Sequence, residues 1–210
     1  MAGPLTLTRI LFLAGAVIAL SHLANDWVDL AAPGGLAWKA GGIVLLGLSA
    51  LTRKAWLPAA GLLLSSVGDV LLELDGWFVG GMAAFGLGHL CYLLAFAGWI
   101  GRDGLNRKAW PLAGLVLVIS IALGAWFFPG MGNLTGPALA YQFIISGMVI
   151  TAMLSKAPAA ARWGAVIFML SDSLIAVGKF AHLEVPPGSV WLTYAIAQIL
   201  LAWGLPRTRP

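Results

Sequence analysis

The chain has 210 residues, of which 60% are hydrophobic and only 10% are charged. Soluble domains carry about 25% charged residues, so this chain lacks the charge to cover a water-facing surface and is not a soluble, disordered or fibrous protein. Its single cysteine, Cys91, excludes an internal disulfide. The net charge of +4 is compatible with nucleic acid binding, but the basic residues lie mostly between apolar runs, which argues for no nucleic acid partner. The composition predicts an all-α integral membrane protein.

Eight apolar segments approach the length of about 20 residues that a transmembrane helix needs. In chain order they are residues 5–24, 36–51, 57–74, 77–100, 110–128, 137–154, 161–181 and 189–205. The second segment is short and rich in glycine. Because the connections are too short to hold a soluble domain, we expect residues 1–210 to form a single eight-helix transmembrane domain.

The basic residues indicate an orientation, because cytoplasmic loops are enriched in lysine and arginine. Ten of the twelve fall on one side of the predicted bundle: Arg9, Arg53, Lys54, Arg102, Arg107, Lys108, Lys156, Arg162, Arg207 and Arg209. The connections on the other side carry acidic residues instead: Asp26, Asp29, Asp75 and Glu184. This alternation predicts that both termini are cytoplasmic.

A weaker pattern relates the two halves of the chain. Residues 68–72 (Gly-Asp-Val-Leu-Leu) in the third segment are similar to residues 171–175 (Ser-Asp-Ser-Leu-Ile) in the seventh. The two halves would then hold four segments each in the same orientation. This is a candidate parallel repeat of four plus four helices, as some transporters have.

Polar side chains within the apolar segments suggest a functional site, because ionisable groups inside a membrane are costly. Asp69, His89 and Asp172 lie deepest and need a partner or a polar cavity, so they are the candidate catalytic residues. Further candidates, which we assign to substrate binding, are Lys39, Tyr92, Tyr141, Ser171, Lys179, Tyr194 and Gln198. Given the predicted orientation, these side chains would line a pocket in the middle to outer half of the membrane.

Other readings of several polar residues remain open. Ser65, Tyr194 and Gln198 are also typical of hydrogen bonds between helices. His22 and Glu73 lie near the interface, where solvation alone explains them, and Lys39 and Lys179 have stems long enough to reach the interface. A zinc site needs three or four ligands, which a single well-buried histidine does not favour, so no metal and no cofactor is expected.

No soluble-enzyme signature is present: the chain has no HExxH, CxxC, Gly-x-Ser-x-Gly or Walker motif. Four stretches, however, contain the candidate residues in a recognisable order: residues 61–72 with Asp69, 84–92 with His89, 164–174 with Asp172, and 194–198. In these stretches the chain resembles the YhhN family of multipass membrane proteins, whose characterised members are lysoplasmalogenases. Lys39 also falls where the family carries a lysine, although Ala40 replaces the proline that often follows it.

The resemblance implies an ether hydrolase whose partners are the lipid bilayer and a lysophospholipid substrate. Family members cleave the vinyl ether bond of lysoplasmalogens, such as lysoplasmenyl-ethanolamine and lysoplasmenyl-choline, to a fatty aldehyde and a glycerophospho-base. The reaction begins when the outer alkene carbon is protonated, which generates an oxocarbenium ion to which water adds. This chemistry calls for a protonated carboxyl group and a second, ionised one, as in the carboxylate pairs of glycosidases.

Asp69 and Asp172 suit this pair, without an assignment of which residue is the acid. His89 or Tyr92 would hydrogen-bond the carboxyl groups, and Lys39, together with Lys179, would meet the lipid phosphate at the outer interface. The alternative function is a small proton-coupled transporter in which the two aspartates carry protons. A purely structural membrane protein would not need buried carboxylates. The compact chain, with no targeting tails, leads us to expect a bacterial inner membrane.

Overall fold

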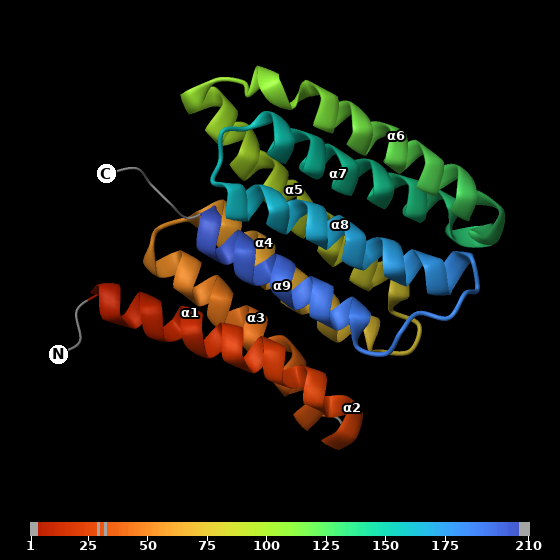
Figure 1. Cartoon of the computed structure of the whole chain (residues 1–210). Coiled ribbons are helices and arrows are strands. Elements are labelled where there is room, and N and C mark those ends of the chain that lie inside the picture. Colours follow the sequence, from red (N-terminus) through yellow and green to blue (C-terminus); the bar gives the residue numbers. More distant parts are fainter. Residues whose placement is uncertain (1–3, 29, 32, 206–210) are drawn as a thin grey trace.

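The protein is a bundle of apolar helices, seen in a computed structural model that describes residues 4–28, 30–31 and 33–205. Within these residues there are eight helices of at least 16 residues and no strands. The long helices are α1 (Pro4–Ser21), α3 (Gly34–Thr52), α4 (Trp56–Leu72), α5 (Phe78–Asp103), α6 (Trp110–Phe127), α7 (Thr135–Leu154), α8 (Ala159–Phe180) and α9 (Ser189–Gly204). Consecutive long helices run in opposite directions (Figure 1). Each predicted segment therefore corresponds to one long helix.

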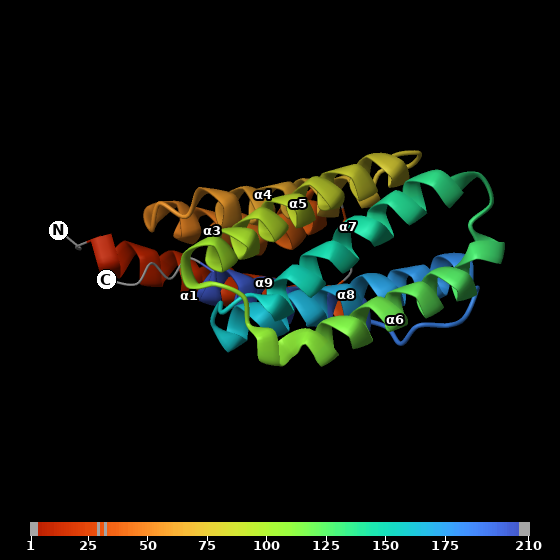
Figure 2. The same cartoon turned by 90° about the horizontal axis from the view of Figure 1, so that it is seen from above.

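The helices form two layers when the bundle is seen from above (Figure 2). One layer contains α3, α4 and α5, the other contains α1, α9, α8 and α6, and α7 crosses from one to the other. Short helical turns complete the connections: η1 (His22–Ala24), α2 (Asn25–Val28), η2 (Arg107–Ala109), η3 (Phe128–Gly130) and η4 (Gly132–Leu134).

Six of the described helical stretches are long and apolar enough to cross a membrane. They are Thr6–Ala24, Gly34–Thr52, Phe78–Asp103, Arg107–Gly130, Gly132–Leu154 and Ala159–Phe180. The remaining two, α4 and α9, are apolar but have only 17 and 16 residues. At about 1.5 Å per residue they are a few ångströms shorter than a hydrocarbon core of about 30 Å. The all-helical, multi-pass membrane fold is confirmed, whereas the eight crossings and the internal repeat stay predictions.

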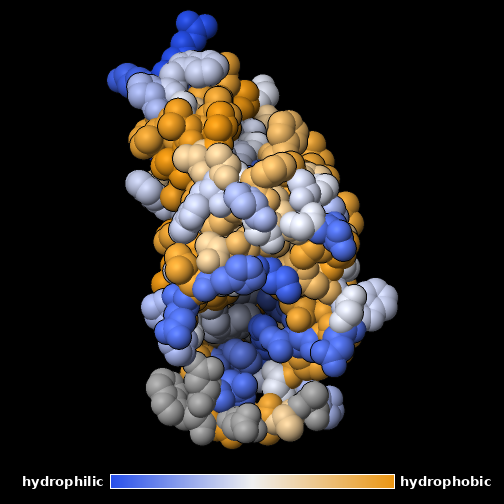
Figure 3. All heavy atoms as spheres, turned by 90° about the vertical axis from the view of Figure 1, so that its right-hand side faces the viewer, coloured by the Kyte–Doolittle hydropathy of each residue, from blue (hydrophilic) through white to orange (hydrophobic). Residues whose placement is uncertain are grey.

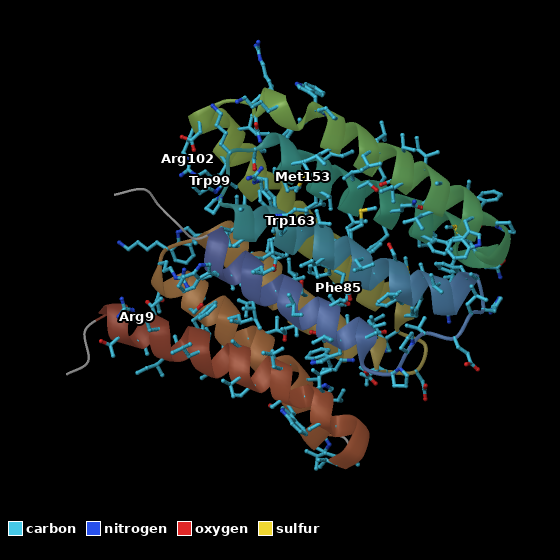
Figure 4. All side chains as sticks on the ribbon, viewed as in Figure 1. Arg9, Phe85, Trp99, Arg102, Met153 and Trp163 are labelled. Carbon is cyan, nitrogen blue, oxygen red and sulfur yellow. The ribbon has the colours of Figure 1, made fainter. Side chains whose placement is uncertain are left out.

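The surface of the bundle is apolar where it would face lipid. On α6, for example, Leu115, Val118 and Ile121 have more than half of their surface exposed. Most basic side chains, other than Lys39 and Lys179, lie instead at the end of the bundle where α1 begins and α9 ends; Arg9 and Arg102 mark it in Figure 4. Arg207 and Arg209, which also contributed to the predicted orientation, lie outside the described residues, as does Asp29.

Glycines on α4 let the aromatic side chains of α5 lie directly against its backbone. A Cβ atom at Gly61 would come within 2.5 Å of the Tyr92 ring, and one at Gly68 within 2.5 Å of the Phe85 ring. Small residues permit such close approach of membrane helices. Since Gly68 precedes Asp69, this packing also fixes the position of the first carboxylate against α5.

Candidate active site

Asp172 on α8 is held by side chains from two other helices. The Tyr141 hydroxyl on α7 donates a hydrogen bond to its Oδ2, with 2.5 Å between the oxygens. The Nε2 atom of His89 on α5 lies 3.1 Å from the same Oδ2 and 2.8 Å from the Tyr141 oxygen. The structure thus brings together the predicted substrate-binding residue Tyr141 and the predicted catalytic residues His89 and Asp172. Asp172 has two neighbouring groups that are able to donate a hydrogen bond to its carboxylate.

His89 is fixed in place by aromatic packing and is fully buried. The edge of its ring meets Phe168, with 4.5 Å between ring centroids at an interplanar angle of 79°. Its Nδ1 atom has no hydrogen-bond partner among the described residues. The imidazole therefore makes its polar contacts through Nε2, toward Asp172 and Tyr141.

Asp69 on α4 is buried, with 4% of its surface exposed. Its Oδ2 accepts a hydrogen bond of 2.7 Å from the Tyr194 hydroxyl on α9. Ser65, one turn earlier on the same face, donates instead to the Gly61 carbonyl within α4. The first carboxylate therefore has one tyrosine donor, where Asp172 has a tyrosine and a histidine.

Both carboxylates line one cavity of about 900 Å³, part of which is open to solvent. It contains the predicted residues Lys39, Asp69, Ser171, Asp172 and Tyr194, and its other lining residues include His22, Asn25, Glu73 and Trp191. Helices from both layers contribute, α3 and α4 from one and α8 and α9 from the other. Figure 3 shows the end of the molecule at which the cavity lies as a hollow bordered by hydrophilic residues. We call this space the polar cavity.

The two short helices explain why a polar cavity fits in an apolar bundle. At this end of the bundle α4 stops at Leu72 and α9 starts at Ser189. Glu73 and Gly188, the residues just beyond these helix ends, line the cavity. The missing helical turns leave space that polar side chains line.

Lys39 is paired with a carboxylate rather than free. Its ammonium group donates a hydrogen bond to Glu73, and this ion pair lies at the cavity wall. The Lys39 Nζ also lies 5.6 Å from the centroid of the Trp191 ring, close enough for a cation–π contact. Trp191 is held in turn by a hydrogen bond of 2.7 Å from its Nε1 to the Ala19 carbonyl.

Sequence reasoning missed two members of this group. Solvation at the interface does not account for the ion pair of Glu73, and Trp191 is not among the residues that the sequence singles out. A signal existed for both: Glu73 is one helical turn beyond Asp69, and Trp191 is three residues before Tyr194. Each shares a helix face with a residue that the sequence did single out.

Five predicted residues do not line the polar cavity: His89 and Tyr141, which contact Asp172 from behind it, and Tyr92, Gln198 and Lys179. The Tyr92 hydroxyl donates to Gln198 Oε1 at 2.7 Å, and both side chains are fully buried between α5 and α9. Lys179 lies elsewhere, with its Nζ 4.7 Å from the Phe78 ring centroid. Ser171 does line the cavity but donates to the Val190 carbonyl, which ties α8 to α9. Among the described residues, no three side chains of His, Cys, Asp or Glu converge as metal ligands do.

Known proteins similar to this chain point to one family. The profile of the YhhN family matches residues 35–205. A protein of Mycobacterium bovis named lysoplasmalogenase is 39% identical over 191 residues, which cover 80% of this chain and 69% of the relative. Human lysoplasmalogenase TMEM86B is 32% identical over 181 residues, covering 79% of this chain and 75% of the relative. No solved structure matches the chain. The chain belongs to the YhhN family.

Proposed function

We propose that this protein is a membrane lysoplasmalogenase, which hydrolyses the vinyl ether bond of a lysoplasmalogen such as lysoplasmenyl-ethanolamine or lysoplasmenyl-choline. The observation that carries the proposal is that Asp69 and Asp172, from the two layers of the bundle, line one cavity together with Lys39. The relatives named lysoplasmalogenase support the same activity. A carboxylate pair next to a cation suits a phosphorylated substrate whose reaction passes through a positive intermediate.

In the proposed reaction a carboxyl group of the pair gives its proton to the alkene carbon farther from the ether oxygen. The other alkene carbon becomes an oxocarbenium ion, which the second, ionised carboxylate stabilises. Water adds to this carbon and returns a proton to the first carboxylate, which restores its starting state. The hemiacetal then moves its hydroxyl proton to the glycerol oxygen as the carbon–oxygen bond breaks, giving aldehyde and glycerophospho-base.

The hydrogen bonds favour Asp69 as the proton donor and Asp172 as the ionised partner. Asp172 has two donor groups beside one oxygen, an arrangement that suits a carboxylate remaining an acceptor throughout the cycle. Asp69 accepts one hydrogen bond at Oδ2, so its other oxygen is available to carry and deliver the proton. His89 and Tyr141 then act as positioning residues that hold Asp172 toward the cavity.

Lys39 is the proposed contact for the lipid phosphate. An ammonium group attracts phosphate as a point charge, and Lys39 lies at the cavity wall. In the structure the Lys39 ammonium group forms an ion pair with the Glu73 carboxylate. When the substrate binds, Lys39 must therefore break its ion pair with Glu73 and form one with the phosphate.

We further propose that all eight long helices cross the membrane, with both termini cytoplasmic and the polar cavity in the outer half. The basic residues at the end where α1 begins and α9 ends support this orientation. The shortness of α4 and α9 is compatible with a crossing because the polar cavity occupies the missing depth. A bacterial inner membrane is the proposed location, in line with the mycobacterial relative.

A product assay tests the function directly. Purified protein in detergent is incubated with a vinyl ether lysolipid, and aldehyde release is followed; the matching saturated-ether lysolipid is the control substrate. Lysoplasmalogenase activity predicts aldehyde from the first compound alone. A proton-coupled transporter, the alternative that the two buried carboxylates also suit, releases none from either.

A further inference from the structure

Asp172 lies where three cavities meet. Besides the polar cavity it lines two others, each of about 430 Å³ with part of that volume open at the surface. The first of these lies between α5, α7 and α8 and includes Phe78 and Met82; the second lies between α6, α7 and α8 and includes Phe127 and Met131. The walls of both are mostly apolar, in contrast to the polar cavity.

Shared lining residues show that the three cavities are neighbours. The first apolar cavity shares Leu72, Phe85 and Ile175 with the polar cavity. The two apolar cavities share Ala176 and Phe180, which lie one and two turns beyond Asp172 on α8. We call the two apolar cavities together the apolar arm.

We propose that the apolar arm binds the hydrocarbon chain of the substrate, and that Ala176 and Phe180 set the chain length that the enzyme accepts. The proposal rests on the lysoplasmalogenase function proposed above. A single-chain lysolipid has a charged head and an apolar chain joined at the bond to be cleaved. With its phosphate at Lys39 and its chain in the apolar arm, that bond lies beside Asp172, where the wall changes from polar to apolar.

Hydrophobic burial explains why the chain leaves the polar cavity. Methylene groups are more stable in an apolar site than beside polar, solvated groups, so a long chain favours the apolar arm over the polar cavity. Ala176 is the critical wall residue because its small side chain lies at the boundary between the two apolar cavities. A large side chain at this position fills part of both apolar cavities.

The experiment compares a short-chain and a long-chain vinyl ether lysolipid, with the protein in lipid nanodiscs. Ala176→Phe should lower kcat/KM for the long-chain substrate by about 10- to 200-fold, the range that poor fit in a hydrophobic pocket produces. The short-chain substrate needs less of this space, so its kcat/KM should fall much less. Leu170→Phe is the matched control, because Leu170 lies on the same helix with half of its surface exposed.

A second variant acts in the opposite direction. Phe180→Ala enlarges the arm, so it should move the preferred chain length upward. It keeps the test decisive if Ala176→Phe fails to fold. An independent binding measurement uses long-chain saturated-ether lysolipid, which should raise the thermal stability of the wild type, since ligands stabilise the state that binds them. The same compound should stabilise Ala176→Phe much less.

The outcomes separate this inference from the function on which it rests. If the wild type cleaves neither vinyl ether substrate, the proposed function is wrong. If the wild type cleaves both, and Ala176→Phe and Phe180→Ala keep its chain-length profile, the apolar arm is not the chain site. An equal loss of kcat/KM for both substrates in Ala176→Phe also overturns the inference. Such a loss would mean that the substitution disturbs Asp172 rather than the binding of the hydrocarbon chain.

Discussion

Tyr194 on α9 donates a hydrogen bond of 2.7 Å to Asp69 on α4, across 125 residues of sequence. The second carboxylate has a matching arrangement, since Asp172 on α8 is contacted by His89 on α5. In each case one helix from the other half of the chain contacts the aspartate, and Asp172 has a further contact from Tyr141 on α7 in its own half. If the predicted repeat relates α4 to α8 and α5 to α9, the two contacts are equivalent under it. Both carboxylates would then depend on the association of the two halves.

The first prediction concerns the carboxylate pair. Asp69→Asn and Asp172→Asn each keep the shape of the side chain but remove the acid or the negative charge. Each should reduce vinyl ether cleavage by at least about 10²- to 10⁴-fold, the usual contribution of general acid–base catalysis. The double variant should be little worse than the poorer single variant, because groups acting as a unit are not additive.

Aldehyde release by the purified variants measures this effect, with size-exclusion profiles as the control for folding. Chelators should leave the wild type active, because in the proposed mechanism a carboxylate, rather than a metal ion, stabilises the oxocarbenium ion. Near-normal cleavage by either asparagine variant would refute the paired-aspartate mechanism and make His89 the leading acid.

The second prediction separates the roles of the two carboxylates through their tyrosine partners. Tyr141→Phe removes a donor from the proposed ionised group, Asp172; hydrogen bonds to charged groups contribute about 1.5–3 kcal/mol, so kcat should fall about 10- to 100-fold. Tyr194→Phe removes a donor from the proposed neutral acid, Asp69, where the same principle gives about 0.5–1.5 kcal/mol and a smaller loss. The kcat values of the two variants are compared. A larger loss of kcat in Tyr194→Phe would make Asp172 the proton donor and Asp69 the ionised carboxylate.

The sequence predicted the helices and the central carboxylates for a clear physical reason. Length and hydropathy restrict where a membrane helix lies, and a charged group inside such a helix is costly enough to stand out. Asp69 and Asp172 were therefore identifiable before any fold was known, and the structure places both at one cavity.

The partners of these groups were harder to predict. A tyrosine in a membrane helix costs little, so nothing in the sequence distinguishes Tyr141, which contacts Asp172, from Tyr92, which binds Gln198. The pairing of Lys39 with Glu73 depends on how α3 lies against the end of α4. The apolar arm depends on side-chain packing among five helices, α4 to α8, which periodicity does not specify.

The third prediction concerns membrane topology. A topology reporter fused after Arg209 and one inserted near Arg107 should both report a cytoplasmic location. A reporter inserted near Asn133 should report a location outside the cytoplasm. The reason is the preference of basic residues for the cytoplasmic side. An external signal at the carboxyl terminus would mean that a membrane span has been miscounted.

The fourth prediction concerns Lys39 and its partner Glu73. Lys39→Ala removes the proposed phosphate contact, a charge-assisted interaction of about 1.5–3 kcal/mol, so KM should rise about 10- to 100-fold with a smaller change in kcat. Glu73→Gln removes the carboxylate that competes with the phosphate, so KM should fall. This change should be at most about fivefold, because pairs this exposed contribute about 0–1 kcal/mol.

The double variant tests whether Glu73 acts through Lys39. If it does, Glu73→Gln lowers KM in the wild-type background but has no effect once Lys39 is alanine, since two residues acting through one contact are coupled. Higher salt should reduce the benefit of Glu73→Gln, because screening weakens the exposed pair that it removes. Loss of turnover with unchanged KM in Lys39→Ala would instead assign Lys39 to the reacting groups, beside Asp69 and Asp172 in the polar cavity.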